Sequence, residues 1–326
     1  MRVLVTGATG FVGFEVARQL AVAGVRPRLL VRRPQRAALL APLDAELVAG
    51  DLRSPASLAR AVDGMDAVIH LAARAAFESY ARVRPSIVDG SLALFRAARQ
   101  SSVSRFVYAS SLLVYGDQEG PIDADTEARP VVAYGRAKLE AERALERESQ
   151  GTDIRLASIR LPHVYGARDL LFERLRTGWV VMAGAGTNRY AHLHVADAAR
   201  VLTSVARRGW QGVSTVADDR SADWREFMDV LRAHYPRLRL VHLPETLARL
   251  GTELLRPLNA LRRRPSLYTP DTVVSWNLNL PVEPGLLWDE IGLRPAYPTI
   301  YEGLPAALDE CVAFRWRHPH YDPARY

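Results

Sequence analysis

The sequence predicts an α/β protein in which a doubly wound parallel sheet carries a smaller, interleaved carboxyl-terminal lobe. Three observations support this fold class. Short β-branched runs alternate with helical segments through the first half of the chain, as they do where helices cover both faces of a parallel sheet. Three closely spaced glycines follow the first run. Beyond residue 236, prolines, tryptophans and short apolar runs replace the regular alternation.

The elements are predicted in chain order from hydrophobic periodicity. Strands are expected at residues 3–6, 28–31, 45–48, 67–71, 105–109, 154–160 and 213–217, and helices at 11–23, around 58–61, 88–100, 133–148 and 193–206. Residues 1–165 should therefore form the sheet domain, to which residues 193–217 return. Residues 166–192 and 236–326 should form the second lobe.

The composition indicates a globular protein and disfavours a nucleic-acid-binding one. The chain has 326 residues, of which 48% are hydrophobic and 24% are charged, an ordinary globular balance that suits one large domain or two smaller ones. The net charge of +7 comes mostly from scattered arginines, without zinc-finger spacing or a basic stripe interleaved with aromatics. Anionic cofactors therefore explain the charge better than nucleic acid does.

Three features bear on location. The lone cysteine, Cys311, cannot form an internal disulfide, and the first residues enter a strand without the series typical of a secretion signal. No apolar run approaches the roughly 20 residues that cross a bilayer. We expect a cytoplasmic protein without a transmembrane segment, and peripheral contact with a membrane stays open as an alternative.

The glycine loop, residues 7–13, comes directly after the first predicted strand. Gly7 permits a tight turn, Gly10 lets the backbone approach a pyrophosphate, and Gly13 lets the next helix lie close to the strand. The helix N-terminus adds unpaired N–H donors. The pattern is typical of a Rossmann dinucleotide-binding domain, and the alternative is a glycine-rich turn without a ligand. Three other loop residues complete the predicted cofactor contacts: Thr9, Phe11 and Val12.

The end of the second strand predicts which dinucleotide binds. A carboxylate there would accept hydrogen bonds from the ribose 2′-hydroxyl, but the sequence has Arg32 and Arg33. Because guanidinium groups bind a 2′-phosphate bidentately, we predict NADP(H) rather than NAD(H). The alternative is two solvated surface arginines.

Other residues at the carboxyl ends of predicted strands should line the cofactor crevice. They are Asp51, Leu52, Leu71, Ala72, Ala73 and Pro162. Asp51 is a candidate acceptor for the adenine amino group. Its alternative role is to cap the helix that starts near Pro55.

Tyr134 and Lys138 lie one turn apart on a predicted helix. A cation beside a phenol favours the phenolate, so the pair should lower the tyrosine pKa towards a value useful for proton transfer. Ser110 and Ser111 follow the fifth strand and can donate to a substrate oxygen. Taken alone, a tyrosine and a lysine at this spacing are more often surface residues, but the glycine loop and the serines favour a functional role.

These motifs together resemble the extended short-chain dehydrogenase/reductase family, whose members include NAD-dependent epimerases and dehydratases. The matching segments are residues 6–13, 70–73, 110–116 and 134–138. The resemblance implies that Tyr134 is the catalytic acid and base, that Lys138 orients the nicotinamide ribose, and that Ser111 positions the reacting oxygen. It also implies a hydride-transferring enzyme that forms a homodimer.

Three positions depart from family patterns. Ile87 stands where many relatives have an asparagine that holds a water near the lysine, which leaves the proton relay open. His163 and Tyr190 stand where sugar-nucleotide enzymes have an asparagine and an arginine, with Arg189 as the residue that could replace the latter. We therefore expect a hydrophobic hydroxyl or ketone substrate, as in sterol dehydrogenases or dihydroflavonol reductases. Two alternatives are a nucleotide-sugar epimerase or dehydratase with tightly bound NAD, and a non-catalytic regulatory protein.

Three histidines allow further hypotheses. His163 is a candidate for a second acid or base, because histidine as a residue type suits proton transfer, although a histidine at a strand end more often only bonds nearby backbone. His192 and His194 have no carboxylate or cysteine at a metal-ligand spacing, so we predict no metal.

The segment 243–261 places leucines at helical spacing among arginines, with Arg262 to Arg264 after it. Ordinary packing against the second lobe is the favoured interpretation, and a lid or a membrane-surface helix are the alternatives. Pro257 should kink or divide this helix.

Overall fold

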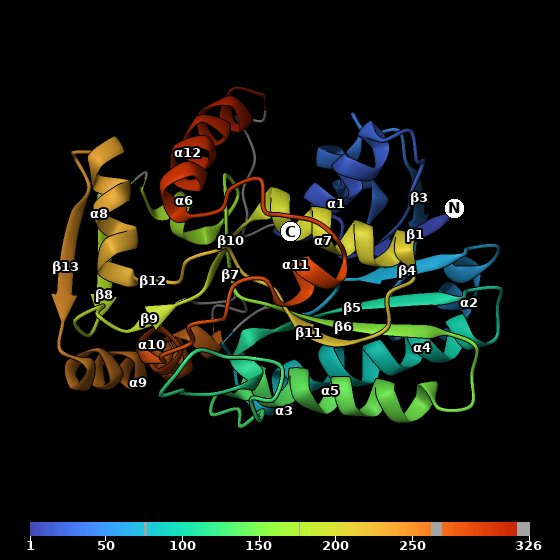
Figure 1. Cartoon of the computed structure of the whole chain (residues 1–326), viewed down its shortest axis with the longest axis horizontal. Coiled ribbons are helices and arrows are strands. Elements are labelled where there is room, and N and C mark those ends of the chain that lie inside the picture. The colour runs from blue at the N-terminus through green and yellow to red at the C-terminus, as the bar shows by residue number, and fades with distance from the viewer. Residues whose placement is uncertain (75–76, 176, 262–268, 318–326) are drawn as a thin grey trace.

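The central feature of the protein is one seven-stranded parallel sheet. The computed structural model describes residues 1–74, 77–175, 177–261 and 269–317. The strand order is β11-β6-β5-β4-β1-β2-β3, and every neighbouring pair is parallel (Figure 1). The strands are β1 (Val3–Thr6), β2 (Arg28–Val31), β3 (Glu46–Ala49), β4 (Ala67–His70), β5 (Arg105–Ser111), β6 (Arg155–Leu161) and β11 (Gly212–Thr215). The predicted fold class is confirmed.

Helices cover both faces of the sheet because its strands are apolar on both faces. Alternate residues of one strand, such as Val3 and Leu4, belong to different buried clusters. Residues of α1, α7 and α11 pack on the Val3 side, and those of α2, α4 and α5 on the Leu4 side (Figure 1). These helices are α1 (Phe11–Val22), α2 (Pro55–Val62), α4 (Gly90–Arg99), α5 (Ala133–Ser149), α7 (Val195–Arg208) and α11 (Leu286–Glu290).

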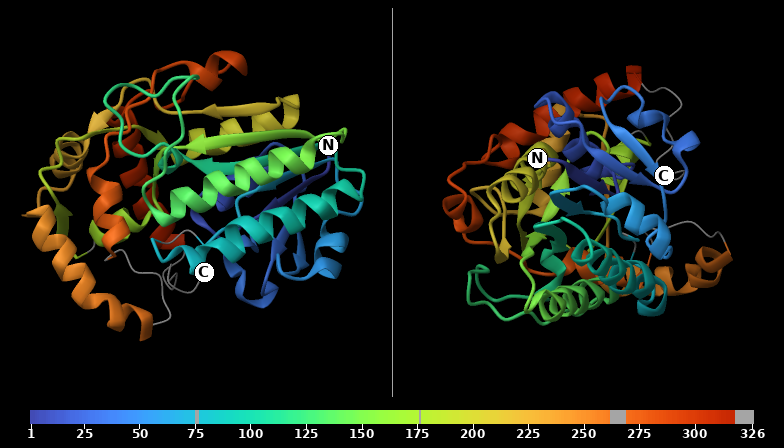
Figure 2. Two further views of the ribbon diagram at one scale, coloured as in Figure 1. Left: turned by 90° about the horizontal axis from the view of Figure 1, so that it is seen from below. Right: turned by 90° about the vertical axis from the view of Figure 1, so that its right-hand side faces the viewer.

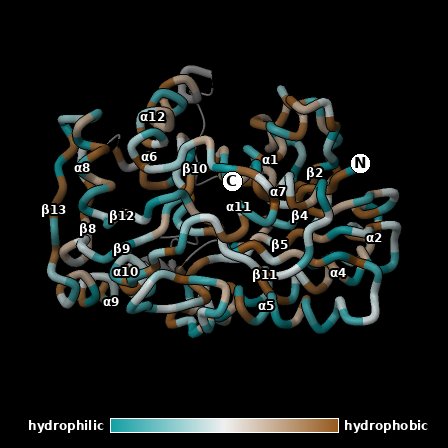
Figure 3. The backbone as a smooth tube through the Cα atoms, viewed as in Figure 1, coloured by the Kyte–Doolittle hydropathy of each residue, from teal (hydrophilic) through white to brown (hydrophobic). Residues whose placement is uncertain are grey.

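The amphipathic pattern of α5 shows how such a helix is positioned. Ala137, Ala141 and Leu145 recur at four-residue spacing and are fully buried against the sheet. Charged residues fill the opposite side, so the hydropathy alternates along the helix in Figure 3. The helix therefore lies along β5 and β6, with its N-terminus at the carboxyl edge of the sheet.

The second lobe extends beyond that carboxyl edge (Figures 1 and 2). It contains three two-stranded sheets and a set of helices around one buried apolar cluster. Its strands are β7 (His163–Tyr165), β8 (Trp179–Ala183), β9 (Arg189–Tyr190), β10 (His192–His194), β12 (Ala222–Asp223) and β13 (Arg239–Leu243). Its helices are α6 (Leu170–Leu175), α8 (Trp224–His234), α9 (Glu245–Leu261), α10 (Pro270–Asn277) and α12 (Ile300–Arg317), whereas α3 (Tyr80–Arg84) packs against α5 beside the central sheet.

The predicted helix at 193–206 is confirmed as α7, but it begins at Val195, because residues 192–194 form β10, which pairs with β7. Pro257 does not divide α9, which runs unbroken from Glu245 to Leu261. The arginines at 262–264 lie outside the described residues. Within the described chain, no helix is long and apolar enough to span a membrane.

Candidate active site

The glycine loop adopts the compact turn that the sequence predicts. Gly7 has a φ of +77°, and a Cβ there would lie 2.8 Å from the backbone nitrogen of Ala72, so only glycine fits between the first and fourth strands. A Cβ on Gly13 would lie 2.2 Å from the Gly7 carbonyl oxygen. The start of α1 is thereby pressed against the loop.

The N-terminus of α1 suits an anionic group. Its first turn has no acidic residue, and none of the described side chains caps it. The first N–H groups of a helix have no partner inside the helix and carry the positive end of its dipole. A dinucleotide pyrophosphate is the group that would complete this end.

Arg168, which sequence reasoning missed, lies on the same loop. Its guanidinium donates to the carbonyl oxygens of Thr9 (3.1 Å) and Gly10 (3.4 Å), and it stacks on the ring of Phe14 at 4.6 Å. The side chain is buried and comes from the chain just after β7. A second-lobe cation thus braces the glycine loop from outside the motif. No local pattern predicts this contact, because 158 residues separate Gly10 from Arg168.

The other predicted cofactor residues gather at the carboxyl ends of the strands. Arg32 and Arg33 follow β2 directly and are exposed. The Asp51 carboxylate, beyond β3, accepts from the backbone and guanidinium N–H groups of Arg53, which lowers its pKa. Asp51 does not cap α2, whose N-cap is Ser54. The remaining members are half-buried: Leu52, Leu71, Ala72, Ala73 and Pro162.

Gly135 brings α5 into contact with the turn that follows β5. A Cβ there would lie 2.1 Å from the carbonyl oxygen of Leu113. Ser111 ends β5 and begins this turn, and its hydroxyl accepts from the Leu113 backbone N–H. Because Gly135 lies next to Tyr134, the tyrosine and the serine are held at one junction. Ser110 is buried, and its hydroxyl has no hydrogen-bond partner among the described residues.

Lys138 is buried behind Tyr134. Its Nζ donates a 2.6 Å hydrogen bond to the carbonyl oxygen of Ala109 and lies 4.7 Å from the ring centre of Tyr108 and 5.7 Å from that of Tyr134. It is the only lysine among the chain's 43 lysines and arginines. An arginine stays charged at any working pH. Lys138 is therefore the one side chain among these lysines and arginines whose charge burial can remove.

The pKa values differ from the sequence-based prediction. Burial lowers the pKa of Lys138 to about 7, although Glu142 partly opposes this. Burial raises the pKa of Tyr134, and the predicted lowering by the lysine is wrong for this structure. The reason is that loss of solvent disfavours both charged forms, the ammonium and the phenolate. Tyr134 is therefore protonated at neutral pH.

A buried hydrogen-bond chain lies beneath the junction. His70 contacts the Thr6 hydroxyl through Nδ1 (2.6 Å) and the Ser91 hydroxyl through Nε2 (2.9 Å), and burial lowers its pKa to about 3. Thr6 accepts from the Ala72 N–H, and Ser91 donates to the Ile87 carbonyl. Because the Ser91 hydroxyl donates to Ile87, it must accept from His70 Nε2. The lowered pKa keeps the ring neutral, so Nδ1 accepts from the Thr6 hydroxyl.

Ile87, which replaces the family asparagine, lies within a π-helical turn, Pro85–Asp89. Such a turn releases a backbone carbonyl from the regular helical pattern. Here the Ser91 hydroxyl satisfies the Ile87 carbonyl. The chain therefore lacks the asparagine, and the position that it would take lies within a widened helical turn.

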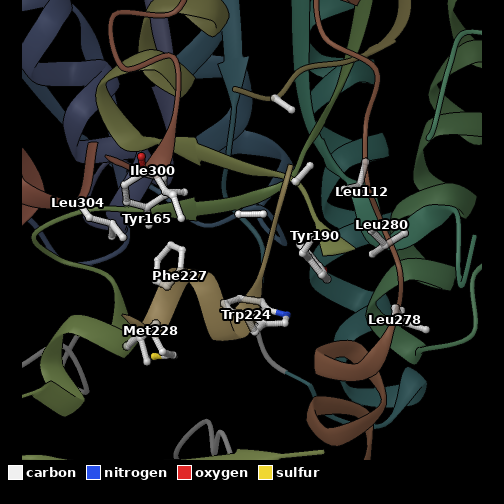
Figure 4. Packing of buried hydrophobic residues seen from close by; sticks show 14 of the residues in the cluster. Leu112, Tyr165, Tyr190, Trp224, Phe227, Met228, Leu278, Leu280, Ile300 and Leu304 are labelled. Carbon is white, nitrogen blue, oxygen red and sulfur yellow. The ribbon is translucent and has the colours of Figure 1, made fainter. Parts of the chain in front are cut away.

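His163 and Tyr190 lie in an aromatic cluster of the second lobe, formed with Tyr165, Trp224, Phe227 and Trp276. Figure 4 shows four members of this cluster: Tyr165, Tyr190, Trp224 and Phe227. The His163 ring lies 4.8 Å from that of Trp224, and Trp276 stacks on Trp224 at 5.0 Å. The partners of His163 are other side chains rather than backbone: His192 through Nδ1 at 3.0 Å, and the Asp169 carboxylate at 3.5 Å. Tyr190 is buried, so it forms part of an apolar wall.

Two remaining predictions concern the second lobe. Arg189 is exposed, and its guanidinium donates to the Ser221 carbonyl at 3.4 Å. His192 is fully buried, and His194 caps α7 by accepting from the Ala196 N–H. Across the described ranges, no three His, Cys, Asp or Glu side chains come together as metal ligands would.

Comparison with known proteins gives three findings. The model of the NAD dependent epimerase/dehydratase family matches residues 3–216. Ceramide reductase from Caulobacter vibrioides is 31% identical over 277 residues, which cover 82% of this chain and 81% of that protein. The 4-hydroxy-2-methyl-3-oxo-4-farnesyl-3,4-dihydroquinoline-1-oxide ketoreductase from Stigmatella aurantiaca is 27% identical over 283 residues, 82% of this chain and 84% of the relative.

A solved structure shares the fold. MoeE5, in complex with UDP-glucose and NAD, superposes with a TM-score of 0.78 over 97% of this chain and all of its own, at 24% sequence identity. At that identity the likeness extends to the architecture alone.

Proposed function

This chain belongs to the NAD dependent epimerase/dehydratase family and is an NAD(P)-dependent oxidoreductase-like enzyme, and on that premise we propose that it reduces the ketone, or oxidises the hydroxyl, of a hydrophobic small molecule with NADP(H). Tyr134 is the proposed acid and base. Residues 1–165 and 193–217 would bind the cofactor, and residues 166–192 and 236–326 the substrate.

One observation carries the choice of substrate: Tyr134 packs against the apolar cluster of the second lobe. The ring of Phe77 lies 6.2 Å from the ring of Tyr134. The same cluster includes Leu112, beside the turn that Ser111 begins, and Tyr190. A substrate carbon presented to Tyr134 would therefore meet apolar side chains, which favour a hydrophobic molecule.

The packing of two side chains and the substrates of two relatives support a hydrophobic molecule over a sugar nucleotide. A nucleoside diphosphate needs fixed cations or amides, whereas Tyr190 and His163 are packed among tryptophan and phenylalanine rings. The two relatives named above are described as reductases of a ceramide and of a farnesyl-bearing quinoline. Both names indicate substrates with long apolar parts, and we extend that chemical class to this protein.

The proposed chemistry uses the protonation states that burial imposes. The bound nicotinamide supplies or accepts a hydride. In the reductive direction, Tyr134 donates its phenolic proton to the substrate oxygen as the carbonyl carbon gains the hydride, so that the ketone becomes an alcohol. Ser111 would hydrogen-bond the same oxygen, and Lys138, with a pKa of about 7, can return a proton to the tyrosine.

The choice of NADP(H) is supported by Arg32 and Arg33. Both are exposed directly after β2, at the edge where the ribose of a dinucleotide lies in this fold class. Among the described residues, no ion pair involves either guanidinium. A 2′-phosphate would bind these groups more favourably than a neutral 2′-hydroxyl.

Turnover tests the reaction. NADPH oxidation would be measured with long-chain ketones, ketosteroids, flavonoid ketones and nucleotide sugars. We expect turnover with a hydrophobic ketone and a loss of about 100-fold or more in kcat for Tyr134→Phe, since a positioned acid contributes on the order of 10² to 10⁴. Tyr301→Phe removes an exposed phenol from α12 and is the matched control. Interconversion of nucleotide sugars without net cofactor consumption would instead establish an epimerase and refute the proposal.

Cofactor affinity is tested separately by fluorescence titration with NADPH and NADH. Arg32→Ala should weaken NADPH binding about tenfold or more and leave NADH binding nearly unchanged. Arg26→Ala is the control, because Arg26 precedes β2 at the opposite end of the strand and pairs with Asp44. A preference for NADH that persists in Arg32→Ala would refute the NADP assignment, and the proposed reaction would be unaffected.

A further inference from the structure

Helix α9 presents its large apolar residues to solvent. Leu247, Leu250 and Leu254 are 57%, 59% and 73% exposed. Their spacing places them on one side of the helix. The opposite side carries Ala248, Gly251 and Thr252, of which Thr252 is only 7% exposed, and also Leu255, which is 40% exposed. In a helix that packs by its leucines, the arrangement would be the reverse. The predicted packing of this helix against the second lobe is confirmed by its contacts with α10, but Leu247, Leu250 and Leu254 stay largely exposed.

The apolar surface continues onto a neighbouring pair of strands. Strand β13 pairs in register with β8, and α9 follows β13 after one proline. Trp179 and Val181 alternate on the outer side of β8 and are half exposed, whereas Val180 and Met182 are buried. We call the outward side chains of β8, β13 and α9 the leucine face. Its exposed large apolar residues are Trp179, Val181, Leu243, Leu247, Leu250 and Leu254.

The leucine face lies at the outside of the second lobe. Figure 1 and both views of Figure 2 place α9 at the periphery, beyond α10 and away from the sheet. Isolated exposed leucines are ordinary, but three large apolar side chains exposed on one side of a single helix, close in the chain to the exposed Leu243, are typical of a surface that another body covers.

The charge of this part of the chain indicates what that body is. Its described residues 232–255 carry four arginines against two glutamates. The longer stretch 232–264, which reaches past the described residues, has eight arginines against two glutamates in the sequence. Arg239 stacks on Trp179 at 5.1 Å. A second copy of this face would bring like charges together, whereas an anionic lipid surface would attract them.

We propose that the leucine face docks the protein onto an anionic membrane surface. The leucines and Trp179 would enter the boundary between headgroups and acyl chains, and the arginines would contact lipid phosphates, as in other interfacial amphipathic helices. The face is also one helix away from the site: α9 packs against α10, and Asp271 of α10 accepts from the Ala133 N–H, next to Tyr134.

Vesicle co-sedimentation of the full chain tests the proposal. The probes are vesicles of phosphatidylcholine alone and of phosphatidylcholine with phosphatidylglycerol. We expect binding to the anionic vesicles that falls at least tenfold in the double variant Leu250→Asp/Leu254→Asp. Val22→Asp is the matched control, since Val22 is an equally exposed apolar residue on α1 in the other domain, and it should bind as the wild type does. Arg237→Ala/Arg239→Ala should weaken binding to anionic vesicles severalfold.

Two results would overturn the proposal. One is the absence of binding to anionic vesicles, or binding that the leucine variant retains in full. The other is a lipid-free dimer, seen by light scattering, that Leu250→Asp/Leu254→Asp converts to a monomer, because a second copy would then cover the face. The leucine variant should have the same melting temperature as the wild type, which shows that a loss of binding does not come from unfolding. Turnover with a soluble ketone should be unchanged by the substitutions, so that failure of docking and failure of the proposed reaction are distinguished.

Discussion

The Lys138 amine donates a 2.6 Å hydrogen bond to the carbonyl oxygen of Ala109, and this bond ties helix α5 to strand β5 directly behind Tyr134. The contact holds the only lysine of the chain in a buried position. It also keeps the amine out of water, which is why its pKa falls to about 7.

The Lys138 pKa can be measured directly. Because there is one lysine, isotope-labelled lysine gives a single side-chain amine resonance in the NMR spectrum, and its titration should have a midpoint near pH 7 rather than near the unperturbed value of about 10.4. A midpoint above pH 9 would show that the amine stays charged when buried.

The same shift predicts a pH dependence of stability. Between pH 7 and about 10.4 the unfolded chain holds a proton on Lys138 that the native chain has lost, so the free energy of unfolding should rise with pH by about 1.4 kcal/mol per unit. Below pH 7 both states are protonated and the slope vanishes. Denaturant unfolding of the wild type and of Lys138→Met, compared from pH 6 to 9.5, isolates this contribution. Parallel curves would contradict it.

Gly135→Ala should damage the site by steric contact. A Cβ would lie 2.1 Å from the Leu113 carbonyl oxygen, so α5 must move away from the turn that Ser111 begins. We expect destabilisation of about 1–3 kcal/mol and a loss of at least tenfold in kcat. The matched substitution is Gly251→Ala in α9, where a Cβ meets nothing within 4 Å. It should stabilise the helix slightly, by up to about 1 kcal/mol. Equal behaviour of the two variants would refute the close contact.

Arg168→Ala should weaken cofactor binding from outside the glycine motif. The variant loses two charged hydrogen bonds to the loop carbonyls of Thr9 and Gly10. Such bonds contribute roughly 1.5–3 kcal/mol each when fully formed, so a rise of about 10- to 100-fold in the NADPH dissociation constant is expected. Arg105→Ala removes similar bonds to the carbonyls of Ala206 and Arg207, at the opposite end of the sheet. An unchanged NADPH dissociation constant in Arg168→Ala would show that Arg168 does not stabilise the loop for cofactor binding.

His70→Ala should change the response to acid. The native pKa of about 3 lies below the unperturbed 6.5. As pH falls through 6.5, the unfolded chain therefore gains a proton that native His70 cannot take. This histidine should cost about 1.4 kcal/mol of stability per pH unit between 6.5 and 4, and that part of the slope should disappear in the variant. At pH 7 the variant should be less stable by roughly 1–3 kcal/mol, since Thr6 and Ser91 lose their partner. Unfolding curves at pH 4.5 and 7 decide between these outcomes and an unchanged slope.

Local patterns were sufficient for the sheet and for the family. The strand at 28–31 and the start of the helix at residue 133 agree with prediction, because a short apolar run and the buried side of a helix are both encoded within the segment itself. The resemblance to the extended short-chain family, inferred from four short motifs, is confirmed by the family match over residues 3–216. Motif order along the chain is a local property, so no tertiary information was needed.

The sequence by itself determined the fold class, the glycine loop and the Tyr134–Lys138 pair, since each depends on neighbours within a few residues. Only the tertiary structure decided the protonation of that pair, because burial and not spacing sets the pKa of Tyr134 and Lys138. It also decided that Arg168 braces the loop and that the α9 leucines face outwards. Amphipathic spacing shows that a helix has an apolar side, but what covers that side depends on residues far away in the sequence.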